Sequence, residues 1–356
     1  MVMQTRSRQF FKVLMACGCL CVPLVIAACG DDDDNPPPVA VDPRVPPPAA
    51  NFSVTGISPR FGVAGNEIEV TITGQNFPTD PRVIFSVDRP AARIVSSSAT
   101  EIVAVTPDNV SAGVITVASA TNSAASPIPF TPTIFSGEEP DLALIIDVSG
   151  SSSATFQGSP VGDLNQDGTD DTILDAEIAA YLTLNQELIN LGLGNIADIS
   201  VIPFSSDASV LDLDPTQDGI QAFAKPDQDS NGNGILDIEE AFRTLISEGS
   251  TNYEAALQLA NTTLTSQPDT GTTPEEIRSN RNVIFLSDGE PTAGADAASE
   301  YGGSVDPLTA LAENVRAFGV GTGATLPTLQ VIDPNAQIFT TSDELLFVIR
   351  GGQLQN

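Results

Sequence analysis

The sequence of 356 residues contains no histidine. This absence excludes Ser/His/Asp triads, Cys/His dyads and every zinc site that uses imidazole. All four cysteines lie within the first 29 residues, so the rest of the chain has neither disulfides nor thiolate metal ligands. The folded part must therefore be stabilised by packing, and bound ions are the remaining kind of support.

Basic residues are also scarce, since 14 Lys and Arg stand against 46 Asp and Glu and the formal net charge is −32. Such a surface repels nucleic-acid phosphates and anionic lipid headgroups, and it favours basic partners and divalent cations. An acidic composition also serves solubility alone, so the pattern of the acids has to decide. We expect no nucleic-acid partner, and the sequence indicates no oligomeric state.

The N-terminus has the order of a secretory signal. Arg6, Arg8 and Lys12 precede an apolar run over residues 13–28, which is shorter than the ~20 residues that span a bilayer. The run ends in IAAC, which resembles the lipobox of bacterial lipoproteins. This resemblance implies that residues 1–28 are a signal peptide and that Cys29 is lipidated and begins the mature chain. An uncleaved membrane anchor is the alternative.

Residues 29–51 are predicted to be a tether. The acidic run GDDDDN and a proline-rich stretch follow Cys29 without hydrophobic periodicity, which is typical of an extended, semi-rigid spacer. The acidic run resembles the surface-export tag of some bacterial lipoproteins, although four aspartates can also simply solvate a linker. We therefore expect an extracytoplasmic protein, lipid-anchored to a bacterial membrane, in the outer membrane or at the cell surface.

Residues 52–132 have the pattern of an all-β domain. Short alternating runs such as EIEVTIT, RVIFSV, EIVAVT and GVITVAS are separated by Gly, Pro, Asn and Asp. The opening VTGISPRFGVAGNEIEVTITGQNFP resembles an IPT/TIG domain at Pro59, Gly62, Gly65, Gly74 and Phe77. The resemblance implies a small immunoglobulin-like sandwich that serves as a spacer or a binding module.

Residues 140–351 change to apolar strands that alternate with helical segments. DLALIID, ADISVIPF, RNVIFLS, RAFGVGTG and AQIFTT read as strands, and DAEIAAYLTLNQELINLGL and YEAALQLANTTL have helical periodicity. This order predicts an α/β domain with a doubly wound, mostly parallel, Rossmann-like sheet. Ligands of such sheets bind beyond the carboxyl ends of the strands.

Acids and hydroxyls follow two of these strands and precede one helix. The stretch LIIDVSGSSS, residues 144–153, leaves Asp147 at a strand end, where a buried carboxylate is costly unless a base, a helix N-terminus or a metal compensates it. GSTNYEAAL and FLSDGEPT add a threonine and a second strand-end aspartate. Together they resemble the metal-ion-dependent adhesion site (MIDAS) of von Willebrand factor type A (vWA) domains. The residues implied are Asp147, Ser149, Ser151, Thr251 and Asp288.

The ion expected there is Mg²⁺ or Mn²⁺, because a small hard cation prefers six oxygen ligands. In the family the hydroxyls are the main direct ligands and the aspartates act partly through water, so that the carboxylate of a partner protein can complete the shell. In the alternative reading, Ser149, Ser151 and Thr251 only cap helices.

Residues 229–240 have the spacing of an EF-hand-type calcium loop, DSNGNGILDIEE, with Gly234 at the turn and EEAFRTLI as the exiting helix. The predicted ligands are Asp229, Asn231, Asn233, the carbonyl of Ile235, Asp237 and Glu240. A solvated Asn/Gly turn is the alternative. Because calcium is abundant outside cells, a calcium loop would agree with the export signal.

Residues 163–175 begin as a second calcium loop, with Asp163, Asn165, Asp167 and Gly168. Leu174 then stands where the closing acid is expected, and Asp175 follows one residue late. Asp171 is the further ligand that we expect, and whether this loop binds an ion stays open. Calcium is thus predicted at one or two loops.

The sequence favours a binding or adhesion protein that uses a divalent ion to bind a protein ligand. A calcium-dependent structural or envelope-scaffold protein is the first alternative. A metal-dependent hydrolase would need a general base, and without histidine only carboxylates or Lys225 remain, so we expect no enzyme. A phosphoacceptor domain would lack an acidic pair before Asp147 and a phosphoryl donor outside the cell.

Overall fold

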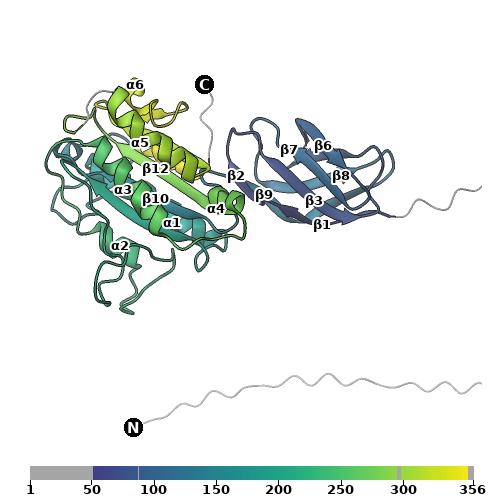
Figure 1. Ribbon diagram of the computed structural model, residues 1–356, viewed down its shortest axis with the longest axis horizontal. Helices are drawn as coiled ribbons and strands as arrows, with labels where there is room; N and C mark the ends of the chain where they lie inside the picture. Colours follow the sequence, from purple (N-terminus) through teal and green to yellow (C-terminus); the bar gives the residue numbers. More distant parts are fainter. Residues whose placement is uncertain (1–50, 87, 295–297, 352–356) are drawn as a thin grey trace, which may run out of the picture. The chain divides into compact units, whose positions relative to one another are not determined.

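The computed structural model describes residues 51–86, 88–294 and 298–351 (Figure 1). The predicted signal peptide, Cys29 and all but the last residue of the predicted tether lie outside the described residues. Two folded regions follow one another along the chain, a β-sandwich and an α/β domain, so the predicted fold class is confirmed.

The sandwich consists of two sheets. One has the strand order β1-β3-β7-β6 and the other β2-β9-β8-β4-β5. Val70 and Ile72 of β3 are completely buried, whereas Glu69 and Thr73 on either side of them are exposed, which is the period of two expected for a half-buried strand. The strands are β1 (Ser53–Ser58), β2 (Phe61–Val63), β3 (Glu69–Gln75), β4 (Arg82–Phe85), β5 (Arg89–Pro90), β6 (Arg93–Ser97), β7 (Glu101–Val105), β8 (Gly113–Ala118) and β9 (Ser123–Thr133).

The α/β domain has a five-stranded sheet in the order β11-β10-β12-β13-β14, with every neighbouring pair parallel. The strands are β10 (Asp141–Asp147), β11 (Asp198–Phe204), β12 (Arg281–Ser287), β13 (Asn314–Val320) and β14 (Gln337–Phe339). The strand predicted over 316–323 ends at Val320, because Gly321 turns the backbone into the left-handed region with φ of 90°.

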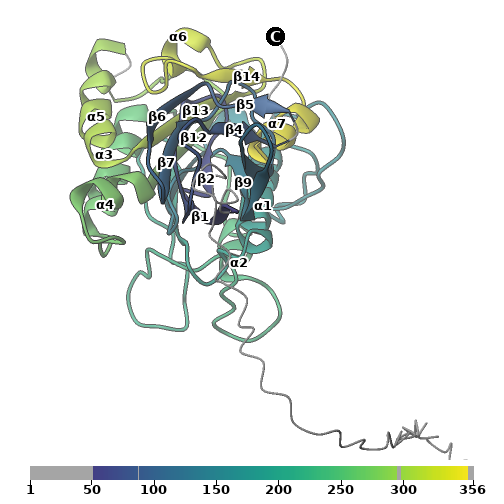
Figure 2. The same ribbon diagram turned by 90° about the vertical axis from the view of Figure 1, so that its right-hand side faces the viewer.

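Helices cover both faces of this sheet, which explains the continuous apolar runs of its strands. Leu144 and Ile146 of β10 face the layer of α1 and α7, and Ala143 and Ile145 face the layer of α3 and α5. Figure 2 shows α1 and α7 on one side of the sheet and α3 and α5 on the other. These helices are α1 (Ile173–Asn190), α3 (Tyr253–Ser266), α5 (Ala298–Leu311) and α7 (Ser342–Ile349).

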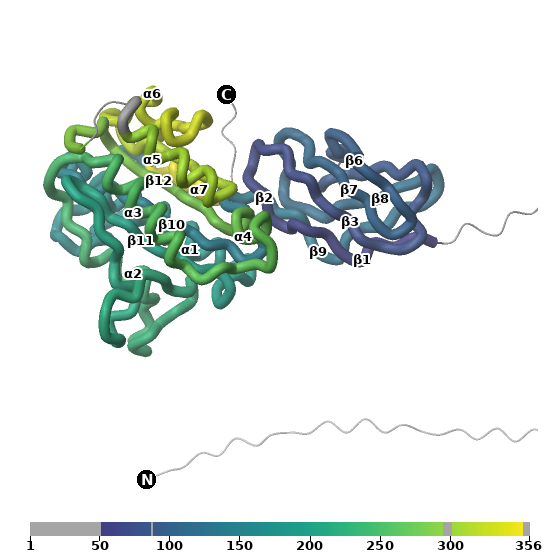
Figure 3. The backbone as a smooth tube through the Cα atoms, in the orientation of Figure 1, coloured from purple at the N-terminus to yellow at the C-terminus, as the bar shows by residue number. Residues whose placement is uncertain are grey.

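Four shorter helices lie in the connections: η1 (Gly150–Ser153), α2 (Asp237–Phe242), α4 (Pro274–Asn280) and α6 (Leu326–Leu329). The backbone tube of Figure 3 shows α2 within the long connection between β11 and α3, which carries the second predicted calcium loop. Within the described part of the chain, no helix is both long and apolar enough to cross a membrane.

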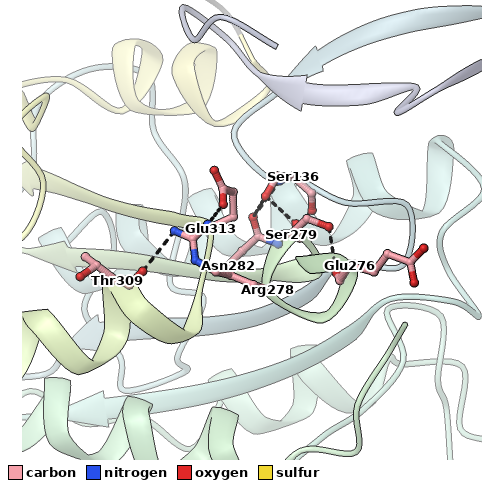
Figure 4. Close-up of polar contacts among 7 residues, drawn as sticks. All are labelled: Ser136, Glu276, Arg278, Ser279, Asn282, Thr309 and Glu313. Atoms are coloured by element: carbon pink, nitrogen blue, oxygen red, sulfur yellow. Dashed lines mark hydrogen bonds and ion pairs between the residues drawn. The ribbon is translucent and has the colours of Figure 1, made fainter. Parts of the chain in front are cut away.

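A polar network occupies the amino end of the sheet, before β12 (Figure 4). The Ser136 hydroxyl donates to the Ser279 carbonyl at 2.8 Å, and the Ser136 amide donates to Asn282 Oδ1 at 2.8 Å. Arg278 forms an ion pair with Glu313. The polar groups of this network pair with one another, so we assign it a structural role and turn to the opposite edge of the sheet.

Candidate functional site

The carboxyl edge of the sheet has its topological switch point beside β10. From β10 the chain passes to β11 on one side of β10 and then to β12 on its other side. Ligands of doubly wound sheets bind beyond such a switch point. Asp147 is the last residue of β10, and Asp288 directly follows β12. The parallel pairing of these strands brings the two aspartates to the same edge.

Asp147 is completely buried and is held by hydrogen bonds from both sides. The Ser149 amide donates to Asp147 Oδ1 at 2.9 Å, and the Ser287 hydroxyl donates to Oδ2 at 2.6 Å. Tyr253 in turn donates its hydroxyl to the Gly289 carbonyl at 2.6 Å and lies 3.0 Å from the Ser287 hydroxyl. The orientation of Asp147 is therefore determined by strands β10 and β12 and helix α3 together.

A chain of oxygens links the first loop to the second strand end. The Ser149 and Ser151 hydroxyls are 3.0 Å apart, and the Ser151 hydroxyl donates to Asp288 Oδ1 at 2.9 Å. Ser149 and Asp288 are 1% and 2% exposed, whereas Ser151 is exposed to solvent. The oxygens thus form a row that begins in the interior and reaches the surface at Ser151.

Thr251 reaches the same place from the loop before α3. The Gly150 amide donates to the Gly249 carbonyl at 3.1 Å, which ties this loop to the serine loop. A methyl group added at Gly289 would lie 3.8 Å from the Ser151 hydroxyl and 4.0 Å from the Thr251 hydroxyl, so both hydroxyls border the space beside Gly289. The structure therefore brings together all five residues of the predicted MIDAS, from three separate loops.

The electrostatics of this cluster are unfavourable without a cation. Burial, and next the charge of Asp288, raise the pKa of Asp147 to about 7 although the Ser287 and Ser149 hydrogen bonds lower it. Burial also raises the pKa of Asp288, against the Ser151 hydrogen bond. Within the described residues no ion pair includes either aspartate. A positive charge placed here would relieve both effects.

The donor set fits a small hard cation. Three neutral hydroxyls and two carboxylates are oxygen ligands of the kind that Mg²⁺ and Mn²⁺ take. Across the residues that the structure describes, no group of three or more His, Cys, Asp or Glu side chains is arranged to hold a metal. The role of Ser149, Ser151 and Thr251 as ligands stays a prediction.

Three further residues around the site were not predicted. Ser287 and Tyr253 support Asp147 as described above, and each stands within two residues of a predicted ligand. Glu177 of α1 is completely buried, and burial followed by the charges of Asp147 and Asp288 raises its pKa well above the usual range. The sequence contains a signal for Glu177, because it interrupts an apolar helical stripe that includes Leu174 and Tyr181.

The two predicted calcium loops share one backbone geometry over their first six residues. Asp163 Oδ2 accepts the Gly168 amide at 2.9 Å, and Asp229 Oδ2 accepts the Gly234 amide at 2.9 Å. Both glycines have left-handed backbones, with φ of 95° and 86°. An aspartate at position 1 that closes on a glycine at position 6 is the turn that the EF-hand spacing predicts.

The second loop gathers four of its predicted ligands. Asn231 and Asn233 donate their side-chain amides to the two carboxylate oxygens of Glu240, and the Asp229 carboxylate accepts the Gly232 amide at 2.8 Å. Asp237 differs, because its carboxylate accepts the Ser230 amide at 2.9 Å. Ile235 follows Gly234 in the loop. The exiting helix α2 ends at Phe242, earlier than predicted.

The first loop departs from the pattern where the sequence does. Asp175 lies in the capping box of α1, where it accepts the Thr172 amide at 2.9 Å, and it also accepts the Leu164 amide at 2.7 Å. Asp171 turns back and accepts the Val161 amide at 2.7 Å. Asn165 donates to the Leu245 carbonyl at 3.1 Å, and Asp167 accepts the Thr169 amide at 2.8 Å.

Fold and site together define an α/β domain with an oxygen-rich cluster at the switch point of a parallel sheet, preceded in the chain by a β-sandwich. Residues 53–133 match the family model of the IPT/TIG domain, in agreement with the resemblance seen in the sequence. A comparison of the whole chain with curated proteins finds no match.

Several solved structures resemble this one. They include a von Willebrand factor type A protein from Catenulispora acidiphila (15% identity, TM-score 0.43, covering 84% of this chain and 48% of that one). Another is proximal thread matrix protein 1 from the mussel byssus, with a zinc-occupied MIDAS motif (17%, 0.43, 60% and 47%). A third is the pilus adhesin SpaC from Lactobacillus rhamnosus GG (14%, 0.41, 66% and 31%). This chain thus covers about half or less of each of these structures.

Proposed function

We propose that this chain is a lipid-anchored, extracytoplasmic binding protein whose α/β domain is a vWA domain with a divalent cation at a MIDAS. The cation would be Mg²⁺ or Mn²⁺, held by Asp147, Ser149, Ser151, Thr251 and Asp288. The IPT/TIG domain would hold this domain away from the membrane to which Cys29 is anchored. No catalytic step is part of the proposal.

The observation that carries the proposal is the convergence of the three loops. Helix capping alone does not require the Ser151 hydroxyl to bond Asp288, a residue 137 positions away in the chain. A bound cation supplies positive charge and an open coordination position, to which a carboxylate of a partner protein can bind. The side chains of this chain orient the ion, and the exposure of Ser151 gives the partner access from solvent.

The two acidic loops are proposed to bind calcium and to stiffen the α/β domain. The second loop is the stronger candidate, because Asn231 and Asn233 both bond Glu240, the residue at the closing position, while the Asp229 carboxylate accepts an amide of the same loop. A calcium-dependent scaffold without a MIDAS ligand is the second candidate function. The loop geometry favours it, because calcium binding there needs no contribution from Asp147.

Calorimetric titration of Mg²⁺ and Mn²⁺, with calcium at a fixed saturating concentration, tests the proposal. We expect the wild type to bind one ion, Asp147→Ala to bind none, and Thr251→Ala to bind more weakly because it loses one neutral ligand. Ser153→Ala is the matched control, since the Ser153 hydroxyl is exposed and bonds the Gly150 carbonyl at 2.8 Å.

Identical isotherms for the wild type and Asp147→Ala would refute the cation site. Partner binding is tested on the same four proteins by capture from surface extracts in Mg²⁺, in calcium or in chelator. A captured protein that requires Mg²⁺ and is lost with Thr251→Ala but not with Ser153→Ala would support the adhesion role. Capture that requires calcium and not Mg²⁺, and that Thr251→Ala leaves unchanged, would favour the scaffold role.

A further inference from the structure

Glu177 is a buried acid for which the described part of the chain supplies no ion-pair partner. Its side chain is 0% exposed, and neither carboxylate oxygen has a hydrogen-bond partner among the described residues. A buried charge without a partner costs several kcal/mol, whereas an apolar side chain at this place would extend the packed face of α1. Packing therefore gives no reason for a glutamate here.

The helix places Glu177 beneath the candidate site. Tyr181, one turn later on the same face, donates its hydroxyl to the carbonyls of Ile145 at 2.5 Å and Ile284 at 2.8 Å, so this face of α1 lies on β10 and β12. Glu177 is one turn closer to the start of α1. Because α1 connects the end of β10 to the start of the parallel strand β11, its first turns lie at the carboxyl edge of the sheet, on the side of Asp147 and Asp288.

Two structural explanations for Glu177 fail. It does not cap α1, because Thr172 and Asp175 already form a complete capping box at the start of that helix. It does not neutralise a basic residue either, because no ion pair within residues 51–86, 88–294 and 298–351 includes it. The charged groups that act on it include Asp147 and Asp288 of the site, and a bound cation would offset the repulsion among the three acids.

We propose that Glu177 is a further residue of the cation site, whose carboxylate compensates the ion from the core side and raises the affinity for a divalent cation. This inference rests on the proposed function, because it requires the ion at Asp147 and Asp288. Glu177 acts as a positioning residue through the surrounding shell and not as a direct ligand, since the carboxylates do not form a metal-holding group by themselves. The three carboxylates together select a divalent over a monovalent ion.

Binding of Mn²⁺, measured by loss of the free-ion electron paramagnetic resonance signal at fixed saturating calcium, tests this role. Glu177→Gln keeps the size of the side chain and removes its charge. We expect its affinity for Mn²⁺ to fall by roughly 10-fold to 100-fold, as residues that support metal ligands typically do. The ion-free variant should melt at or above the temperature of the ion-free wild type, because a buried acid has been removed.

The control is Glu187→Gln, which makes the same charge change ten residues later on the same helix, roughly 15 Å away. It should bind Mn²⁺ as the wild type does. If Glu177→Gln fails to fold, Glu177→Asp and Glu177→Asn provide the same comparison of a charged with an uncharged side chain, at a shorter side-chain length. The Asp variant should then bind Mn²⁺ more tightly than the Asn variant.

Equal affinity of Glu177→Gln and the wild type, or of the Asp and Asn variants, would overturn the role of Glu177 while leaving the cation site intact. A wild type that binds no Mn²⁺ would overturn the proposed function itself, so the two failures are distinguishable.

Discussion

Hydrogen bonds from serine residues partly offset the cost of the buried acids at the candidate site. Ser287 and Ser149 each donate a hydrogen bond to Asp147, and Ser151 donates one to Asp288. These bonds lower the pKa values of both carboxyls but do not offset the effect of burial. At the scale of single residues, the hydrogen bonds therefore orient the two carboxyls, but a positive charge to balance them is still missing from the described residues.

Asp141, at the opposite end of β10, is expected to make stability depend on pH. It is completely buried, and burial raises its pKa to about 7, aided by the charge of Asp198 and opposed by Thr270, Arg281 and Lys225. The folded protein then binds this proton more tightly than the unfolded chain does. The resulting stability is complete below about pH 4 and is lost as the pH rises through about 7.

Asp141→Asn should therefore flatten the decline in unfolding free energy between about pH 4 and 7, by a few kcal/mol at most, since one pKa unit corresponds to about 1.4 kcal/mol. Urea unfolding of the variant and the wild type at pH 5 and pH 8, at fixed calcium, measures the change in unfolding free energy between the two pH values. Asp218→Asn, at an exposed position, is the control. Declines of the same size in both variants would contradict the assignment to Asp141.

At the scale of elements, the two acidic loops start alike and end differently. Both close an aspartate on a left-handed glycine, but the second loop leads into α2 with Glu240 facing the loop, and the first leads into α1 with Asp175 in the helix cap. The difference follows from one position in the sequence, because Leu174 stands where Glu240 stands in the other loop.

Glu240→Ala should remove most of the stabilisation by calcium. An ion that binds only the folded state stabilises it by about 2.7 kcal/mol at 100 times its dissociation constant. Melting temperatures with calcium and with chelator measure the gain. Glu239→Ala is the matched control, since Glu239 pairs with Arg243 on the surface of α2. If Glu240→Ala keeps the gain of the wild type, the second loop is not the calcium site.

Asp175→Ala should destabilise the protein by at least about 1 kcal/mol, the usual cost of a lost helix cap, and by the same amount with and without calcium. Its carboxylate accepts amides from Thr172 and Leu164, so its role does not depend on an ion. Chemical denaturation in both conditions measures the cost. A loss seen only in calcium would instead make Asp175 the closing ligand of the first loop.

At the scale of the whole molecule, the predicted order is anchor, tether, IPT/TIG domain and α/β domain. The formal net charge of −32 suits a protein that meets divalent cations outside the cell, and the loops and the candidate site place acids where such ions would bind. Cys29 lies outside the described residues, so the anchor stays a prediction from IAAC.

Mass spectrometry of the mature N-terminus tests the anchor. We expect an acylated Cys29 as the first residue, and Cys29→Ser should leave an unprocessed precursor because the lipidation target is lost. Cys21→Ser, within the apolar run, should be processed normally. A mature chain that begins elsewhere, without lipid, would refute the prediction.

The sequence by itself determined the elements and their order. Apolar runs such as LALII predict strands that are buried on both faces, and alternating runs such as EVTIT predict half-buried ones, because burial follows the period of the backbone. The five predicted MIDAS positions could also be found, since each stands at a strand end or a helix start and resembles a known pattern. Their role as ligands remains a prediction.

The tertiary structure alone decided which groups meet. Ser287 and Tyr253 support Asp147 only because β12 and α3 pack beside β10, and no local pattern encodes that contact. Asp237 faces Ser230, and Asp175 caps α1, because each carboxylate accepts the nearest free amides of its own helix start or loop. The role proposed for Glu177 depends on Asp147 and Asp288, which the fold places at the same edge of the sheet. Periodicity reports which face of an element is buried, whereas the chemistry of a buried face depends on what the fold places against it.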